Sequence, residues 1–210
     1  MRTLFLLLIM SIPITHNCSY AEDEPDPVGN IRNAVFKLEV KRRGQKETSY
    51  LTGVQIGPRL AMTAAHGVRP VVEFIRFGPY GKMNFNYAIS DQHKDIAIFR
   101  TPTADFVADL VPEQKYQEGD AIVIAGHGSS SGYRTMHGNI KNLCRIQDWE
   151  LIHTDIPIEF GDSGGVILDA DGKCIGMVFS RGADDGGLAV GVGLHTINYC
   201  LEKIRRKADK

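Results

Sequence analysis

The chain has little cysteine, with four residues in 210, and a single tryptophan. So few cysteines exclude a small scaffold held by several disulfides, and the fold must depend mainly on an apolar core. The seven histidines show no H-E-x-x-H spacing, and no C-x-x-C pair occurs. These two absences argue against a metal site, so we expect neither a metal nor another cofactor.

An excess of charge of either sign is also missing, since 24 lysines and arginines stand against 25 acidic residues. No basic stripe stands out along the sequence, so nucleic acid is not expected as a partner. The short basic run Arg205-Arg206-Lys207 is better explained as the solvated end of a helix. The oligomeric state is not predicted by these patterns.

The apolar run Leu4–Ile14 is too short to span a bilayer, for which about 20 residues are needed. It follows the charged start Met1-Arg2 and precedes small residues that end at Ala21. This order is typical of a secretory signal peptide over residues 1–21, with a retained anchor as the alternative. We expect export to a periplasm or to the extracellular space, no membrane contact after cleavage, and an acidic lead-in at residues 22–29.

Three cysteines remain after the predicted cleavage: Cys144, Cys174 and Cys200. An oxidising compartment permits one disulfide among them and leaves one thiol over. The sequence leaves all three pairings open.

From Ala34 onward the sequence changes to short apolar runs separated by glycine, proline and polar turns. Phe36, Leu38 and Val40 alternate with charged residues, which is the pattern of a half-buried strand. Six candidate strands precede a linker at Thr101–Gln117, and six follow it. The candidates are Phe36–Val40, Tyr50–Ile56, Leu60–Ala65, Val71–Phe77, Tyr87–Ser90, Ile96–Phe99, Ala121–Ala125, Thr135–Leu143, Glu150–Thr154, Gly165–Leu168, Lys173–Phe179 and Leu188–Leu194. Many short strands at this spacing favour an all-β protein built of antiparallel barrels.

The end of the chain predicts a helix. Ile197, Leu201 and Ile204 fall at i, i+4 and i+7, so residues His195–Lys207 should form an amphipathic helix with one apolar face. Such a helix needs a surface on which to bury that face.

The stretch Thr154–Gly165, TDIPIEFGDSGG, combines a serine with close glycines. Glycine lets the backbone approach whatever the Ser163 hydroxyl attacks, because it has no Cβ and tolerates positive φ. The N–H groups of Gly161 and Ser163 can then bind a developing oxyanion. The alternative is a glycine-rich turn between two strands.

A serine nucleophile needs a base, and the sequence offers one upstream. His66 ends the apolar run LAMTAAH, and Asp95 opens the run KDIAIF. We assign Ser163 as nucleophile, His66 as general base and then acid, and Asp95 as the group that orients the imidazole. The alternatives are a structural histidine at a strand end and Asp91 as the orienting carboxylate.

TAAH around His66, DIA around Asp95 and GDSGG around Ser163 resemble the three signatures of the trypsin-like serine peptidases. Thr154–Gly165 and the segment Tyr116–Gly128 (YQEGDAIVIAGHG) are similar to the compact bacterial HtrA-like branch. The likeness spans about residues 34–204.

This resemblance implies two packed six-stranded antiparallel β-barrels of the chymotrypsin type with a C-terminal helix. The barrels would occupy residues 30–107 and 108–210 of one peptidase domain. It also implies a secreted serine endopeptidase that hydrolyses protein or peptide substrates through an acyl-enzyme.

Two features depart from the HtrA pattern. No room remains for the PDZ module that HtrA proteins normally carry after the protease. Asp162 stands where they usually have asparagine, and in trypsins this aspartate pairs with a new N-terminus freed by activation cleavage. Only Val28-Gly29 is faintly similar to that N-terminus, so zymogen activation stays open. We expect Asp162 to find a side-chain partner, because a buried carboxylate is costly without one.

In the same family, the residues just before the oxyanion glycine line the S1 pocket, which here implies Pro157, Ile158, Glu159 and Phe160. Val178, Ser180 and Arg181, in the strand segment Val178–Gly182, would form another wall. Neither segment carries an acid placed to recognise lysine or arginine, which favours a small or medium aliphatic P1 residue. An acidic P1 residue, held by Arg181 and His195, is the alternative.

Two other functions remain open. The G-x-S-x-G pattern at Gly161–Gly165 also fits the nucleophile elbow of α/β-hydrolase esterases, with Asp184 or Asp185 and His195 as partners. That elbow needs a helix after the serine, whereas the residues after Gly165 read as strand. The second of these functions is a catalytically silent binding module with the trypsin fold.

Overall fold

The computed structural model describes most of the chain from residue 31 onward. The described residues are 31–41, 46–68, 73–77, 82–83, 86–110, 115–181 and 187–208. The predicted signal peptide and lead-in, with Asp184 and Asp185, lie outside them. Within these ranges no helix is long and apolar enough to cross a membrane.

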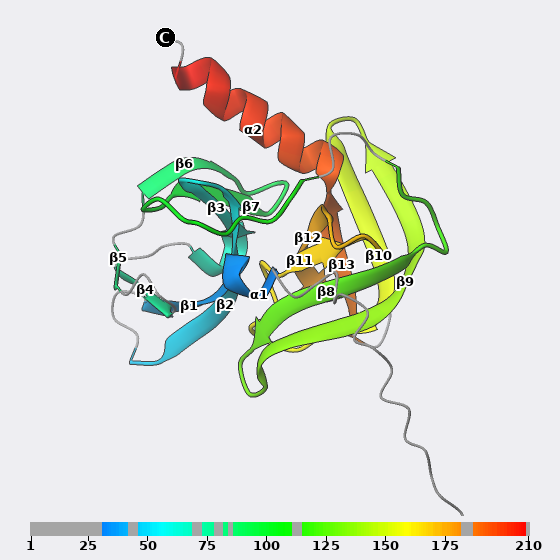
Figure 1. The fold of residues 1–210 in the computed structure, drawn as a ribbon, viewed down its shortest axis with the longest axis horizontal. Coiled ribbons are helices and arrows are strands. Elements are labelled where there is room, and N and C mark those ends of the chain that lie inside the picture. The colour runs from blue at the N-terminus through cyan, green and yellow to red at the C-terminus, as the bar shows by residue number, and fades with distance from the viewer. Residues whose placement is uncertain are drawn as a thin grey trace, which may run out of the picture.

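The first half of the chain forms one antiparallel sheet after a short helix, α1 (Ile31–Ala34). Its strands are β1 (Val35–Lys41), β2 (Thr48–Gly57), β3 (Leu60–Ala64), β4 (Glu73–Phe77), β5 (Lys82–Met83), β6 (Asn86–Asp91) and β7 (Ile96–Arg100). They pair in the order β5-β4-β1-β2-β3-β7-β6 (Figure 1). The predicted alternation is confirmed, because Phe36, Leu38 and Val40 are all buried.

This sheet has seven strands where the sequence predicted six. The added strand is β5, whose two residues are too few to produce an apolar alternation. Among the described residues no pairing joins the two edge strands, β5 and β6, so this sheet is not closed by hydrogen bonds. Closure of the first half into a barrel therefore stays a prediction.

The second half forms a closed antiparallel barrel of six strands, as predicted. Its strands are β8 (Ala121–Gly128), β9 (Gly132–Ile146), β10 (Trp149–Pro157), β11 (Val166–Leu168), β12 (Cys174–Arg181) and β13 (Leu188–Gly193). The order around the barrel is β10-β13-β12-β11-β8-β9, seen beside the first sheet in Figure 1. β9 is longer than predicted because its pairing with β8 continues to the hairpin tip, where Gly128 faces Gly132.

The segment between the halves is bonded to both of them. The N–H groups of Ala104 and Ala108 donate to the carbonyls of Pro58 and Gln55 beside β2, at 2.8 and 2.7 Å. The Cys174 N–H at the start of β12 donates to the Asp109 carbonyl at 2.7 Å. The crossing is thus a fixed connection between the two halves, and the exact boundary at 107/108 stays a prediction.

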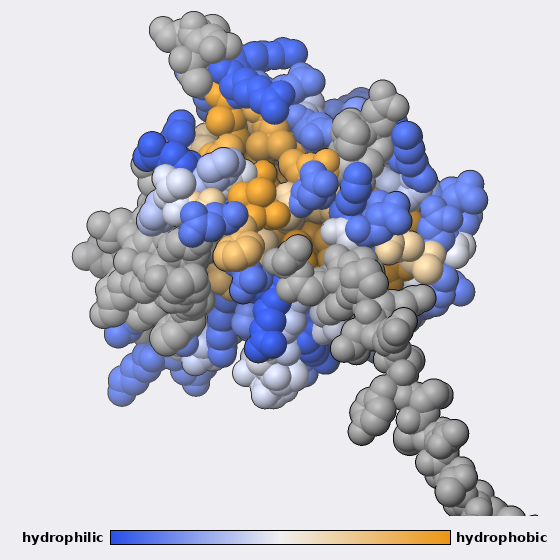
Figure 2. Space-filling view, in the orientation of Figure 1, coloured by the Kyte–Doolittle hydropathy of each residue, from blue (hydrophilic) through white to orange (hydrophobic). Residues whose placement is uncertain are grey.

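The predicted C-terminal helix is confirmed as α2 (Leu194–Ala208). Ile197 and Cys200 are fully buried, and Ile204 is 8% exposed. Figure 2 shows apolar residues where the helix meets the body and hydrophilic residues on its outer turns. α2 therefore covers the core along one face, as its spacing predicts.

Within the described residues Cys144, Cys174 and Cys200 are free, so the disulfide that export permitted is not formed. They lie on three separate elements: β9, β12 and α2. Burial raises the pKa of the Cys174 thiol to about 12 and that of Cys200 to about 11. Both are buried, whereas Cys144 is partly exposed.

We therefore expect only Cys144 of these three to react quickly with a thiol reagent in the folded protein, because thiolate and access are both needed. Labelling at pH 8 followed by peptide mapping checks this, and Cys174 and Cys200 should react after unfolding. Rapid labelling of Cys174 in the folded protein would contradict the packing of β12.

Candidate active site

His66 and Asp95 lie side by side because their strands pair. β3 pairs with β7 with Ala64 opposite Ile96, so the turns that carry His66 and Asp95 meet at one end of the sheet. The Asp95 carboxylate then accepts two hydrogen bonds from His66, from the backbone N–H at 2.6 Å and from ring Nδ1 at 2.7 Å. A neutral imidazole with its proton on Nδ1 presents Nε2 as the acceptor.

The alternative carboxylate, Asp91, has a different task. Its Oδ1 accepts from the backbone N–H groups of His93 and Lys94 at 3.1 and 3.2 Å, which closes the turn before β7. Asp95 itself has φ of +50°, uncommon for any residue but glycine. Such strain persists only where neighbours hold it, and here the Asp95 carbonyl also accepts from Ala65 N–H at 3.0 Å.

Ser163 lies in the loop between β10 and β11, where the backbone comes close to β2. Gly164 has φ of +90°, and a Cβ there would lie 2.0 Å from the Thr52 carbonyl oxygen. Gly161 has φ of +100°, and its Cβ would lie 2.6 Å from the carbonyl oxygen of His127. The expected need for glycine on both sides of the serine is therefore confirmed.

His66, Asp95 and Ser163 line one pocket of about 370 Å³. It is further lined by Ile158, Glu159, Phe160, Phe179 and Ser180. A second pocket, also about 370 Å³, shares His66, Phe160 and Ser163 with the first and adds Ser49, Tyr50, Leu51, Gly67, Ser129 and Gly161. The structure thus brings the three predicted residues to one pocket, and a second pocket shares His66 and Ser163 with it.

The predicted pocket wall on β12 needs a correction. Val178 is fully buried and packs in the barrel core, because side chains alternate along a strand. Its backbone acts instead on the serine loop, accepting from Gly164 N–H at 2.6 Å and donating to the Gly165 carbonyl at 2.8 Å. Phe179, which the sequence analysis did not single out, lines the pocket together with Ser180. Arg181 ends β12, and its side chain lies outside the described part of the chain.

His195 lies away from both pockets. Its ring nitrogen Nδ1 contacts an Arg145 guanidinium nitrogen at 2.5 Å, at the start of α2. It is thus not placed to hold an acidic P1 residue. The esterase alternative is wrong, because strand β11 follows Gly165 where the elbow needs a helix.

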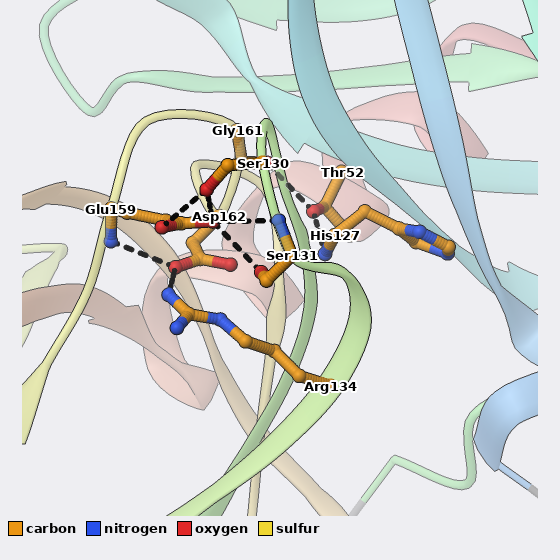
Figure 3. A network of polar contacts seen from close by, with 8 residues as sticks. All are labelled: Thr52, His127, Ser130, Ser131, Arg134, Glu159, Gly161 and Asp162. Atoms are coloured by element: carbon orange, nitrogen blue, oxygen red, sulfur yellow. Dashed lines mark hydrogen bonds and ion pairs between the residues drawn. The ribbon is translucent and has the colours of Figure 1, made fainter.

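Asp162 has the side-chain partner that its burial required. The carboxylate is fully buried and forms an ion pair with Arg134 of β9, whose side chain is 29% exposed. The same carboxylate oxygen accepts from Glu159 N–H at 2.9 Å (Figure 3). The hydrogen bond that Arg134 donates to Asp162 raises the pKa of the Arg134 guanidinium. No local pattern indicated Arg134 as the partner, because 28 positions separate the two residues.

The tip of the β8–β9 hairpin holds the start of the same loop. The Glu159 carboxylate accepts from the hydroxyls of Ser131 at 2.8 Å and Ser130 at 3.0 Å. These hydrogen bonds, and most strongly the one from Ser131, hold the pKa of Glu159 below its usual range. Ser129 N–H donates to the Phe160 carbonyl at 2.7 Å. Glu159 is thus bonded to the hairpin, although it was predicted only as a pocket residue.

In the described part of the chain, no group of three or more histidine, cysteine, aspartate or glutamate residues is placed to hold a metal ion. The polar groups of the cleft are instead paired as base and carboxylate, or bonded to the hairpin. The chemistry that they can support is proton transfer beside a hydroxyl nucleophile.

Several known proteins are similar to this chain. The serine protease Rv3671c of Mycobacterium tuberculosis is 26% identical over 148 residues, which are 64% of this chain and 36% of that protein. This chain therefore spans about a third of the length of the curated relatives that it matches.

Solved structures share the fold. The Rv3671c protease in its active form has a TM-score of 0.77 at 19% identity, covering 96% of this chain and 94% of that chain. A serine endoprotease from Yersinia pestis has 0.75 at 19% identity, covering 87% and 66%. The HtrA-type protease AlgW with a tripeptide has 0.71 at 22% identity, covering 84% and 60%.

A protein family described as the trypsin-like peptidase domain matches residues 51–177. This match covers more than half of the chain and includes His66, Asp95 and Ser163. The chain therefore belongs to the trypsin-like peptidase domain family.

Proposed function

We propose that this protein is a serine endopeptidase that hydrolyses peptide bonds through an acyl-enzyme. The observation that carries the proposal is the doubly hydrogen-bonded pair of His66 and Asp95 in the same pocket as Ser163. Family membership and the bacterial serine proteases of like fold support it. The peptide held by AlgW supports peptides as substrates.

In the proposed reaction, the Ser163 hydroxyl attacks the scissile carbonyl while His66 Nε2 takes its proton. Asp95 keeps the proton of the neutral ring on Nδ1 and stabilises the imidazolium that forms. His66 then gives its proton to the leaving amine, and the C–N bond breaks. Water repeats the sequence on the acyl-enzyme and releases the acid and free Ser163.

Contacts around the serine loop support a formed oxyanion hole. In a trans peptide the C=O and the following N–H point in opposite directions. The Phe160 carbonyl is turned to Ser129, so the Gly161 N–H points away from the hairpin. The Asp162 carbonyl accepts from Gly165 N–H at 2.8 Å. The Ser163 N–H belongs to the same peptide, so it points away from Gly165. This arrangement favours an active enzyme over a silent binding module.

The two pockets that share Ser163 support endopeptidase action. Phe160 lines both of them and is 73% exposed, so it stands where a bound chain would pass. A substrate that fills both pockets must span several residues around Ser163. An extended peptide would add at the end of β12, beyond the residues that pair with β11.

Reaction with a fluorophosphonate probe tests the proposal, because such probes modify activated serines. We expect the probe to label the folded protein at Ser163, as shown by peptide mapping. Ser163→Ala should not be labelled, whereas Ser90→Ala, a change at a β6 residue that lines neither pocket, should be labelled like the wild type. Absence of labelling in the wild type would argue for the silent binding module.

We also propose a small or medium aliphatic P1 residue. The pocket wall contributes the buried Ile158 and the partly buried Phe179, and the nearby Glu159 carboxylate is bonded to the hairpin serines. A peptide library should show kcat/KM at least roughly 10-fold higher for valine, alanine or leucine than for lysine or arginine at P1. Ile158→Ala should shift the preference to larger residues. A preference for arginine or lysine would contradict this assignment.

Finally, we propose that the protein acts after export, in a periplasm or outside the cell. The proposal rests on the sequence of residues 1–21, with its charged start and short apolar run. N-terminal sequencing of the secreted, active protein tests it and shows whether any further cleavage occurs. A start at Glu22 is the expected result.

A further inference from the structure

We infer that the hydroxyl of Thr52, on β2 of the first sheet, is a positioning residue that fixes the oxyanion hole of the second barrel. The inference rests on the proposed function and goes beyond the triad. It assigns a role in the reaction to a side chain that touches neither the substrate nor the reacting atoms.

Thr52 is fully buried, and its hydroxyl is oriented by two partners. The His127 N–H donates to Thr52 Oγ1 at 2.8 Å, and Oγ1 donates to the Gly161 carbonyl at 2.8 Å (Figure 3). Because a backbone N–H can only donate, it occupies an acceptor site of the hydroxyl and leaves the proton for Gly161. The hydroxyl therefore bonds the oxyanion glycine in one direction.

Gly161 needs this support because nothing in the residue itself fixes its conformation. Glycine has no Cβ, so Gly161 can adopt many other backbone conformations as readily as its φ of +100°. The peptide before it is held by Ser129 through the Phe160 carbonyl, and the peptide after it is held by Thr52. With both flanking peptide planes fixed, the direction of the Gly161 N–H is fixed as well.

The backbone of Thr52 strengthens the same connection. Its N–H donates to the Ser163 carbonyl at 2.8 Å, and its own carbonyl accepts from the Thr63 hydroxyl at 2.7 Å. Residue 52 thus reaches both oxyanion residues, one through its side chain and one through its backbone. Substitution by any residue other than proline removes only the side-chain contact.

A positioning role and a merely structural role predict different kinetics. The oxyanion hole acts on charge that develops in the transition state, so its disorder lowers kcat and leaves KM nearly unchanged. Loss of a buried hydrogen bond with no such role lowers stability and leaves kcat of the folded fraction unchanged. The two roles are therefore separated by measuring kcat, KM and the melting temperature together.

The experiment compares Thr52→Val, which keeps the shape and removes the hydroxyl, with Thr52→Ser, which keeps the hydroxyl. Thr196→Val is the matched control. Thr196 is also fully buried, and its hydroxyl accepts from Glu150 N–H at 2.8 Å and donates to the Glu150 carbonyl at 3.5 Å, at the start of α2.

With a peptide amide as substrate, Thr52→Val should lower kcat roughly 10- to 100-fold, less than the 10²–10³ typical for outright loss of an oxyanion donor. KM should stay within about twofold, since substrate binding is not changed. Thr52→Ser should restore kcat to within a few fold, and Thr196→Val should keep the wild-type kcat. A peptide aldehyde binds as a tetrahedral adduct, so its affinity for Thr52→Val should fall by the same factor as kcat.

The inference is overturned if folded Thr52→Val keeps the wild-type kcat, or if its KM rises while kcat stays. If Thr52→Val does not fold, Thr52→Cys replaces it, because a thiol is only a weak donor, and the same loss relative to Thr52→Ser is expected. A wild-type protein without labelling or hydrolysis would mean failure of the proposed function. Full wild-type activity with unchanged variants would mean failure of the Thr52 assignment alone.

Discussion

Ser163→Ala is expected to lower kcat for peptide hydrolysis by roughly 10⁶, which is the loss seen when a triad nucleophile is removed. The reason is that the remaining groups can polarise a carbonyl and bind the chain but offer no atom to form the acyl-enzyme. Steady-state hydrolysis of a fluorogenic peptide amide, with active-site titration of the wild type, measures the change.

The melting temperature should change little, because the Ser163 side chain is only partly buried and Gly161 and Gly164 keep the loop conformation. Equal residual proteolysis in Ser163→Ala and the wild type would mean that a contaminant or another nucleophile does the work. Purification of both proteins by the same steps, followed by labelling, separates these two explanations.

Arg134→Met is expected to destabilise the protein by about 3–5 kcal/mol, because it leaves the fully buried Asp162 carboxylate without its counter-charge. For a domain of this size that loss corresponds to a fall in melting temperature of roughly 10 °C. Activity should fall as well, since Asp162 lies between Gly161 and Ser163 and its carboxylate also holds the Glu159 N–H. Thermal melts and kcat measured on the folded protein check both effects.

The double variant Arg134→Met/Asp162→Asn provides the decisive comparison. Asparagine is neutral and its side-chain oxygen can still accept from Glu159 N–H, so most of the stability and activity should return. Arg206→Met is the matched control. Its ion pair with Glu202 is 79% and 59% exposed, and loss of such a pair should leave the melting temperature unchanged. A double variant as unstable as Arg134→Met alone would show that the charge of Asp162 is not what Arg134 compensates.

The triad candidates could be proposed from the sequence because each lies beside a strand with a clear apolar pattern. His66 lies just after β3 and Asp95 just before β7, and the pairing of these two strands brings the residues together without any long loop. The alternation in β1 and the apolar spacing in α2 were equally readable, since a periodic pattern reports burial directly.

The groups that hold the serine loop were not predictable in the same way. Thr52 and Gly161 are 109 positions apart, and no local pattern distinguishes a threonine that bonds a distant carbonyl from one that fills a strand. Arg134 likewise lies among the polar residues of a long hairpin strand. Val178 was predicted to line the pocket in the place where the structure has Phe179. In a run of apolar residues, the sequence does not show which side chains of a strand point to which face.

Arg134 and Asp162 also have a consequence for how this protein can be handled. Arg134 and Asp162 both belong to the second half of the chain. The ion pair that stabilises the loop before Ser163 therefore does not need the free α-amino group of an N-terminus. An affinity tag or a carrier fused ahead of Ile31 leaves that contact in place.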